Sequence, residues 1–241
     1  MFHPITIEIF AWVAAQTNEH DRATGALQKT LLIPYASTFR KFGQIPVRQE
    51  IMFRSLSKIP MSTPPLPFPT DEELPEDVVR RLRDRPPISI YRLIATAPQL
   101  LIPWTDLVSA LYQSTVPARL REIAILRQAA CANSLYELHQ HGLLALSNGL
   151  SKEEVALITS SQPVTTFSSA ENLVCRMSEQ LERSATLDEA TFTEARALFD
   201  NRQFIELVTV ISFFCCVARF LNATRLKVES GNPLEGRSSP N

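Results

Sequence analysis

Glycine is scarce in this chain, which has 6 glycines among 241 residues, while hydrophobic residues make up 45%. The sequence contains no glycine-rich loop that could wrap a phosphate and no Gly-x-Ser-x-Gly element. Nucleotide-binding loops and α/β-hydrolase sites need those glycines for tight turns and close backbone approach, so both are excluded. Few glycines and many apolar residues favour a helical protein with a sizeable core.

Paired cysteines are also missing. The four cysteines include no Cys-x-x-Cys, and their spacing indicates no disulfide framework. The stretch Met1–Gln16 has no basic leader, so we expect no secretory signal. Both features favour a reducing compartment, and we expect a cytoplasmic protein. The cysteines are Cys131, Cys175, Cys215 and Cys216.

An excess of charge of either sign is absent. The formal net charge is -1, which argues against a nucleic acid or a membrane surface as the partner. Of the four histidines, His139 and His141 are two residues apart, so they point to different sides of a helix and do not form a joint metal site. We therefore expect neither a metal nor another cofactor.

Proline marks the boundary between two parts of the chain. Residues 60–70 read PMSTPPLPFPT, a proline-rich linker. We expect an N-terminal extension over residues 1–60, a helical domain over 61–229 and a disordered tail over 230–241. Apolar periodicity predicts an all-α domain of seven or eight helices. The main predicted helical segments are Asp71–Arg85, Ile88–Pro98, Gln99–Gln113, Pro117–Cys131, Ser134–Asn148, Phe167–Ser184 and Arg202–Val228.

The helices Pro117–Cys131 and Ser134–Asn148 carry acid and base groups on apolar faces. Glu122 falls on the same side of the first helix as Leu126, whereas Arg121 and Gln128 lie well round from it.

On the second helix, Glu137 and His141 are four residues apart and share one face. A short turn favours an antiparallel hairpin, which predicts that Glu122 and His141 lie within hydrogen-bond reach at the wall of an apolar pocket. Such a pair can transfer protons near neutral pH, or it can be a structural pair whose only role is to satisfy the hydrogen bonds of two buried groups.

Other side chains allow two interpretations each. Tyr91, Trp104 and Tyr112 either line a small-molecule pocket or belong to the core. Glu206 is either a third buried acid near the site or a first-turn charge favoured by the helix dipole. The arginine run is either an anion site or a solvated face. It consists of Arg80, Arg81, Arg83 and Arg85.

Three pieces of the sequence carry a family resemblance: LREIAILR (Leu120–Arg127), YELHQHG (Tyr136–Gly142) and GLSKEEVALI (Gly149–Ile158). They resemble the carboxymuconolactone decarboxylase family, which includes the alkylhydroperoxidase D-like proteins. The resemblance implies an alkylhydroperoxidase D-like helical domain over most of the chain. It also implies a homo-oligomer, which we expect to be a dimer or a trimer.

The resemblance departs from the redox pattern at its chemical centre. Redox members of the family use a Cys-x-x-Cys pair, with a glutamate upstream and a histidine downstream as a proton relay. By position, the relay residues are Glu122 and His141, and the thiol positions hold Ser134 and Glu137. A thiolate is the nucleophile of disulfide chemistry, so this pair cannot replace it. The family's decarboxylase branch works without the thiol pair.

Three functions follow from these observations. The first is a cofactor-free acid/base enzyme, a lyase or an isomerase or cyclase, acting on a small organic acid, lactone or secondary-metabolite intermediate. His141 moves the proton, Glu122 sets its tautomer, and Glu137 is a second acid/base group or a substrate contact. The alternatives are an alkylhydroperoxidase-like antioxidant protein and a non-catalytic scaffold with a relict relay. Expected substrate contacts are Tyr136, Ser134, Trp104 and Tyr91.

Overall fold

A computed structural model describes residues 66–229 of the chain. The chain divides into two units, and the second, Thr63–Asn241, contains every described residue. The expected extension over residues 1–60 and the expected tail over residues 230–241 therefore lie outside the described part.

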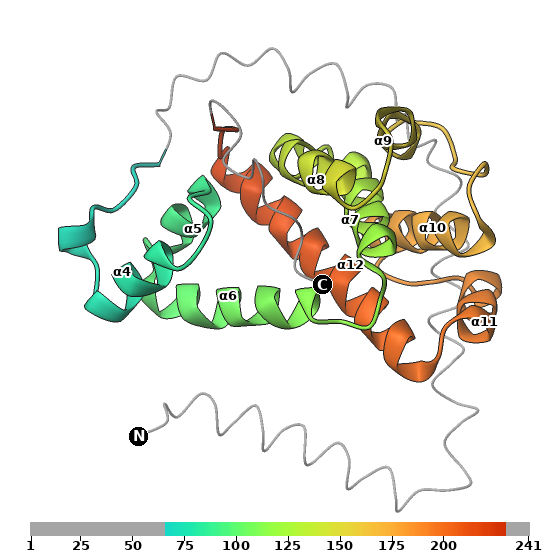
Figure 1. Cartoon of the computed structure of the whole chain (residues 1–241), viewed down its shortest axis with the longest axis horizontal. Helices are drawn as coiled ribbons and strands as arrows, with labels where there is room; N and C mark the ends of the chain where they lie inside the picture. Colours follow the sequence, from blue (N-terminus) through green and yellow to red (C-terminus); the bar gives the residue numbers. More distant parts are fainter. Residues whose placement is uncertain (1–65, 230–241) are drawn as a thin grey trace, which may run out of the picture. The chain divides into compact units, whose positions relative to one another are not determined.

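The described residues form nine α-helices and one 3₁₀ helix, with no strand among them, so the all-α prediction is confirmed (Figure 1). The number of helices is slightly above the expected seven or eight. The elements are η2 (Asp71–Glu73), α4 (Glu76–Arg83), α5 (Ser89–Ile94), α6 (Pro98–Tyr112), α7 (Ala118–Ala132), α8 (Leu135–Ser147), α9 (Lys152–Ile158), α10 (Ser169–Ser184), α11 (Glu189–Leu198) and α12 (Asn201–Thr224).

Helix α7 is the centre of the domain. It packs against α8, α10 and α12, and every residue from Leu120 to Ala129 is buried. The face that carries Glu122 and Leu126 is buried, and so are the other sides of the helix. Arg121 and Gln128 lie on the other sides, yet both are buried because neighbouring helices cover the whole circumference of α7.

Local signals set the helix boundaries around the centre. Asn133 adopts a left-handed conformation (φ 52°) that ends α7, and Ser134 is the N-cap of α8. Gly149, with φ 86°, follows α8 in a conformation that favours glycine. The side chain of Ser151 accepts a hydrogen bond from the Glu154 amide, and the Glu154 side chain accepts one from the Ser151 amide, which makes a capping box at the start of α9.

The last helix is shorter than predicted at its C-terminal end. α12 stops at Thr224 rather than Val228, because Arg225 takes a left-handed conformation (φ 56°). Its 24 residues are long and apolar enough to cross a membrane by length and composition alone. Its buried side chains, such as Leu207 and Val217, nevertheless belong to the two core clusters of the domain, so α12 serves as a core helix here.

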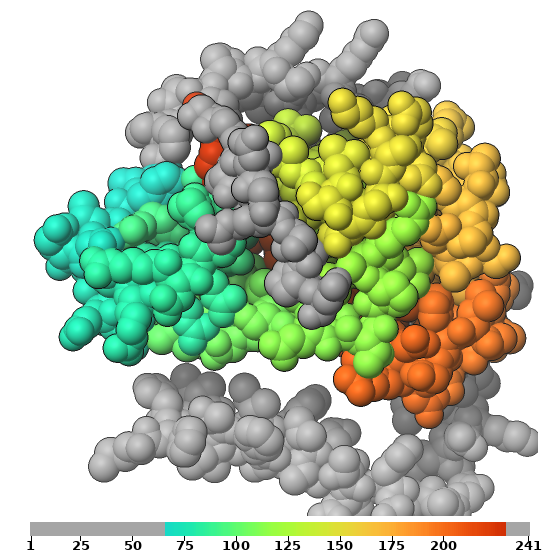
Figure 2. All heavy atoms as spheres, in the orientation of Figure 1, coloured from blue at the N-terminus to red at the C-terminus, as the bar shows by residue number. Residues whose placement is uncertain are grey.

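The two core clusters pack on different faces of α12. One joins α7 and α10 to Leu207, Ile211 and Cys215 of α12, and the other joins α5 and α6 to Val210, Phe214, Val217 and Leu221. Figure 1 shows α12 running between the group α4–α6 and the group α7–α11. In the space-filling view, these two groups occupy opposite sides of the visible face (Figure 2). The candidate site lies where α5, α6, α8 and α12 meet.

Candidate active site

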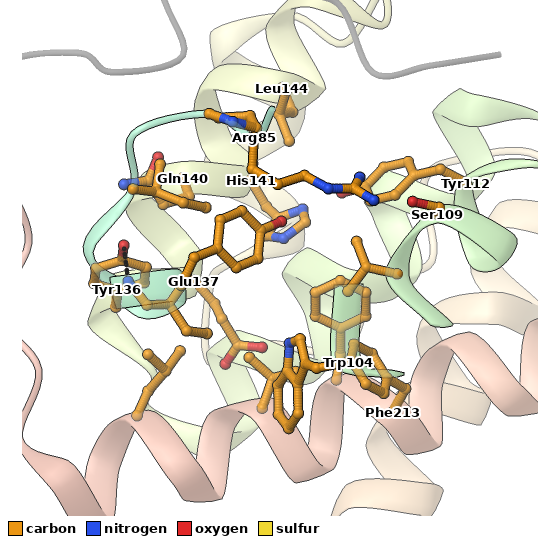
Figure 3. A pocket seen from close by; sticks show the side chains of 18 of the residues that line it. Arg85, Trp104, Ser109, Tyr112, Tyr136, Glu137, Gln140, His141, Leu144 and Phe213 are labelled. Atoms are coloured by element: carbon orange, nitrogen blue, oxygen red, sulfur yellow. Dashed lines mark hydrogen bonds between the residues drawn. The ribbon is translucent and has the colours of Figure 1, made fainter. Parts of the chain in front are cut away.

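A cavity of about 590 Å³ lies between α5, α6, α8 and α12. Its volume is in the range of small-molecule sites, and its wall is mainly apolar with a few polar groups. Figure 3 shows the polar side chains that reach it. The lining residues are Arg85, Pro86 and Ile88 before α5; Ile90 and Tyr91; Trp104, Val108, Ser109, Tyr112 and Gln113; Tyr136, Glu137, Gln140, His141 and Leu144; and Phe213, Phe214, Val217 and Leu221.

The predicted contact between His141 and Glu122 is confirmed. His141 Nδ1 lies 2.8 Å from Glu122 Oε2, and His141 lines the cavity. Glu122 has no exposed surface and lies behind the histidine, outside the cavity wall. The Phe214 ring stacks edge-on against the imidazole with centroids 4.8 Å apart. A carboxylate at Nδ1 selects the tautomer with a proton on that nitrogen, which leaves Nε2 as an acceptor.

The arginines that could have competed for Glu122 are engaged elsewhere. Arg119 pairs with Glu154 at 2.6 Å and with Glu171 at 2.8 Å. Arg127 donates to Glu179 and to the Ile158 carbonyl oxygen, the latter at 2.8 Å. These contacts connect α7 to α9 and α10, so neither arginine competes with His141 of α8 for the Glu122 carboxylate.

Arg121 is a positive neighbour of the Glu122 carboxylate. Its Nε lies 4.0 Å from Glu122 Oε1, and both side chains are buried. The guanidinium also lies 4.6 Å above the Tyr112 ring. The spacing on α7 alone did not indicate this contact, because helical periodicity places Arg121 well round the helix from Glu122.

Glu137 is a buried carboxyl group at the cavity wall. It is 2% exposed, and neither carboxylate oxygen has a hydrogen-bond partner within the described residues. Burial raises the pKa of Glu137 to about 8, partly opposed by the Ser134 side chain and reinforced by the negative charge of Glu182. Ser134 lies close to Glu137, although the two make no hydrogen bond of ordinary geometry. Glu137 therefore keeps its proton at pH 7 and can donate it to a ligand.

Tyr136 and Gln140 are held in place from outside the cavity. The Tyr136 hydroxyl donates to Glu229 Oε1 at 2.5 Å and accepts from the Ile90 amide at 3.3 Å. Gln140 Nε2 donates to Glu229 Oε2 at 2.7 Å. Burial and the Glu229 carboxylate raise the pKa of Tyr136. The hydroxyl is thus committed to its protein partners, and the ring is the part of Tyr136 offered to a ligand.

The aromatic side chains expected to contact the substrate line the cavity, whereas the expected contact Ser134 does not. Tyr91, Trp104 and Tyr112 all line the cavity, and Trp104 packs on Phe213 with ring centroids 5.1 Å apart. Ser134 is fully buried and does not reach the cavity wall. It is the N-cap of α8, two positions before Tyr136, the first residue of this helix that lines the cavity.

Glu206 belongs to a structural contact far from the cavity wall. Its carboxylate accepts from the Thr115 amide at 2.9 Å and from Arg202 Nε at 2.9 Å. Partial burial would raise the pKa of Glu206, but these donors outweigh it and lower the pKa. Both interpretations of Glu206 are wrong, because Glu206 is not among the lining residues and it lies beyond the first turn of α12, which contains no acidic residue.

None of the cysteines lines the cavity, and all are free thiols. Burial raises the pKa of both Cys175 and Cys215 to about 12, and it also raises that of Cys131. A thiol with a raised pKa forms little thiolate, so it is a poor nucleophile. In the described part of the chain, no group of three or more histidine, cysteine or acidic side chains is arranged to hold a metal ion.

Sequence reasoning missed Gln140 and Glu229 and left Arg85 unresolved. Arg85 was part of the arginine run, and only the turn between α4 and α5 decides that this arginine faces the cavity. Arg81, by contrast, pairs with Asp106 on α6 at 2.5 Å. Glu229 follows the last helix, where no periodic pattern could place it.

Comparisons with known proteins agree with this architecture. Residues 98–179 match the model of the carboxymuconolactone decarboxylase family. No curated protein matches the chain.

Solved structures with a similar fold include an uncharacterised peroxidase-related protein with an alkylhydroperoxidase AhpD core from Ralstonia eutropha JMP134. It is 16% identical with a TM-score of 0.64, and the match covers 74% of this chain and 100% of that one. A second uncharacterised peroxidase-related protein, from Silicibacter sp. TM1040, is 17% identical with a TM-score of 0.62, over 72% of this chain and 100% of that one.

At these identities the solved structures establish the fold and nothing about the reaction. The family match covers α6 to the middle of α10 and includes Glu122, Glu137 and His141. Residues 98–179 thus match the carboxymuconolactone decarboxylase family, and the described part of the chain has the helical fold of AhpD-like proteins.

Proposed function

We propose that this protein is a cofactor-free acid/base enzyme, a lyase or isomerase that acts on a small carbonyl compound in the cavity. The observation that carries this proposal is the hydrogen bond between His141 Nδ1 and the buried Glu122 carboxylate. It holds the imidazole in one tautomer, so that Nε2 is the basic atom left for a ligand. No hydrogen bond within residues 66–229 engages Nε2.

The reaction begins with proton removal. Nε2 of His141 takes a proton from the carbon next to a carbonyl group, and Glu122 stabilises the imidazolium that forms. Negative charge then develops on the carbonyl oxygen. Glu137, which keeps its proton at pH 7, donates a hydrogen bond to that oxygen or protonates it.

The second half of the reaction returns the proton. Transfer from His141 to a different carbon of the same intermediate gives an isomer, whereas loss of a leaving group gives a lyase product. Both outcomes need only the apolar cavity, the pair of His141 and Glu122, and the neutral acid Glu137.

The four free thiols fit a reducing compartment, and we propose that the enzyme is cytoplasmic.

The antioxidant alternative needs a reactive thiol near His141. The described cysteines lie away from the cavity, and three of them have raised pKa values. Reduction of an organic hydroperoxide with a dithiol donor would favour this alternative. A scaffold role is opposed by the cavity itself, because a relict relay needs no space of about 590 Å³ beside the histidine.

Hydrogen exchange tests the proposal even though the product is unidentified. A panel of lactones, keto acids and enolisable ketones is incubated with the protein in D₂O, and deuterium uptake at carbon is measured by mass spectrometry. We expect catalysed exchange with at least one compound. His141→Gln should keep the fold and lower that rate by about 10²–10⁴-fold, the usual contribution of a positioned acid or base.

His139→Gln is the matched control, because His139 lies on the same helix and does not line the cavity. It should leave the exchange rate unchanged. Equal rates in wild type and His141→Gln would contradict the proposal. A ¹⁵N spectrum of the ligand-free protein adds a separate check, since His141 should carry its proton on Nδ1.

A further inference from the structure

The cavity wall contains a cation that no described carboxylate neutralises. Arg85 lies in the turn between α4 and α5. Within the described residues, its hydrogen bond runs from Nη2 to the Thr105 carbonyl oxygen at a long 3.4 Å. Arg81, four residues earlier, differs because it pairs with Asp106 at 2.5 Å. Arg85 therefore keeps guanidinium N–H groups free to donate to a ligand.

The charge balance of the cavity is positive at neutral pH. The acid at the wall is Glu137, and its pKa of about 8 keeps it neutral at pH 7. The Glu229 carboxylate lies behind Tyr136, outside the wall, where protein donors occupy both oxygens. The positive charge of Arg85 acts on a group at the cavity wall. Burial raises the pKa of Tyr91, and the charge of Arg85 partly opposes this rise. A cavity with this balance attracts anions.

The groups at the wall are arranged for a ligand with two different ends. In Figure 3 the Arg85 side chain extends towards Tyr112 and Ser109, whereas Glu137 and Trp104 lie on another part of the wall. A guanidinium offers planar, parallel N–H donors that match the two oxygens of a carboxylate. Trp104 and Phe213, in contact with each other, offer aromatic surface to a flat apolar body.

From these contacts we propose that the ligand of this cavity is an aromatic carboxylate, whose carboxylate pairs with Arg85 and whose ring lies against the aromatic wall. This inference names the substrate class of the proposed acid/base reaction and rests on it only for the role of His141. Arg85 precedes residues 98–179, so the preference for a carboxylate comes from the turn between α4 and α5, before the family-matched segment.

A pair of probes of nearly equal shape tests the charge of the ligand. 2-Naphthoate carries a carboxylate, and 2-naphthamide is its neutral counterpart. Binding of each to the full chain is measured by isothermal titration calorimetry at pH 7. We expect wild type to bind naphthoate more tightly, by roughly 10- to 100-fold, the scale of a hydrogen-bonded ion pair that is shielded from water.

Arg85→Gln should remove this preference and leave naphthamide binding within about twofold of wild type. Arg80→Gln is the matched control, because Arg80 is an exposed arginine of α4 that does not line the cavity. It should keep the full preference. Arg85→Lys keeps the charge without the planar fork and should retain part of it.

An additional measurement avoids mutation altogether. In ¹⁵N-labelled wild type, naphthoate should shift the side-chain Nε resonance of Arg85, and naphthamide should not. Equal affinity of wild type for the two probes, a preference that survives Arg85→Gln, or no measurable naphthoate binding would each overturn the inference.

The inference and the proposed function can fail separately. His141→Gln should leave the ratio of the two affinities unchanged, because His141 does not hold the carboxylate. Loss of exchange activity in that variant with an intact ratio supports both ideas. Intact exchange activity in His141→Gln would reject the acid/base role and leave the anion site standing.

Discussion

Glu137 shows how burial alone can prepare a residue for acid chemistry. Its carboxyl group is 2% exposed and has no hydrogen-bond partner among the described residues. Water solvates the ionised form of a carboxyl far better than an apolar wall does, so burial favours the protonated form. The pKa rises to about 8. A ligand oxygen that accepts a hydrogen bond from the Glu137 carboxyl would complete this site. Ligand binding would then offset the free-energy cost of burying this carboxyl without a hydrogen-bond partner.

The raised pKa of Glu137 predicts how stability depends on pH. The unfolded chain loses this proton near the ordinary value of 4.5, whereas the folded chain keeps it up to about pH 8. Unfolding therefore releases a proton in this window, and the free energy of unfolding falls as the pH rises from about 4.5 to 8. Glu137→Gln removes this contribution, so above pH 8 it should be more stable than wild type, by an amount on the order of 3–5 kcal/mol.

Urea denaturation at pH 5, 6.5 and 8 measures this effect, since urea carries no charge. Wild type and Glu137→Gln should agree best at pH 5 and diverge as the pH rises. Glu189→Gln is the control, because Glu189 is exposed in the first turn of α11. It should follow the wild-type curve. Parallel curves for wild type and Glu137→Gln would show that Glu137 ionises normally in the folded protein.

At the scale of elements, the hairpin of α7 and α8 could be predicted because its signals are local. The turn needs a left-handed residue, which Asn133 supplies, and the following helix needs an N-cap at Ser134. Given the hairpin, the inward positions of Glu122 and His141 follow from helical periodicity. The contact at 2.8 Å is a direct consequence of these rules.

The features that could not be predicted depend on contacts between distant segments. The burial of Arg121 depends on which helices surround α7, and a helix with buried residues on every side has no polar face to reveal its orientation. The position of Arg85 depends on a turn, and that of Glu229 on a segment beyond the last helix. Helical periodicity predicts the position of a side chain only inside a helix, so it could not place Arg85 and Glu229 at the site.

Glu229 joins three segments that meet beside the cavity. Its carboxylate accepts from the Ser89 amide on α5 and from Tyr136 and Gln140 on α8. Partial burial would raise the pKa of Glu229, but these hydrogen bonds outweigh it and hold the pKa below its usual value. The stabilisation is therefore present above the unfolded-state value of 4.5 and is lost as the pH falls through the lower folded-state pKa.

Glu229→Gln should destabilise the protein at pH 7 by on the order of 1 kcal/mol, because charge-assisted hydrogen bonds become neutral ones. The difference from wild type should shrink in acid, where wild type also loses the charge. Thermal unfolding at pH 7 and pH 3.5 measures both effects. Lys227→Gln is the control from the same segment, since Lys227 is exposed and makes no hydrogen bond in the described part of the structure. A difference that grows in acid would show that the Glu229 contacts do not depend on its charge.

For the whole molecule, the relay comes from one segment of the chain, whereas the cavity wall is built from that segment and from the segments on both sides of it. The family-matched residues 98–179 supply α7 and α8 and therefore the acid/base groups. The segments outside it supply Arg85 and Tyr91 on one side and the α12 aromatics on the other. Arg85, which is proposed to select the ligand, lies outside the segment that carries the relay, so this position can differ between related proteins without changing Glu122 or His141.

The surface beyond the site predicts an oligomer. At the corner between α11 and α12, Phe192 is 43% exposed, Leu198 is 47% exposed and Ile205 is 62% exposed. Phe192 of α11 stacks on Phe204 of α12 with ring centroids 5.6 Å apart, which joins the two helices at this corner. Exposed apolar patches on soluble domains commonly mark subunit contacts. We expect a homodimer or homotrimer that buries this corner.

Light scattering coupled to size-exclusion chromatography measures the mass in solution. Wild type should elute as a dimer or trimer of the 27.1 kDa chain. Ile205→Glu should shift it towards the monomer, because a carboxylate cannot be buried in an apolar contact without a partner. Leu157→Glu is the control, since Leu157 is 48% exposed on α9, away from this corner. A monomeric wild type, or an oligomer that Ile205→Glu leaves intact and Leu157→Glu disrupts, would exclude the α11–α12 corner as the contact.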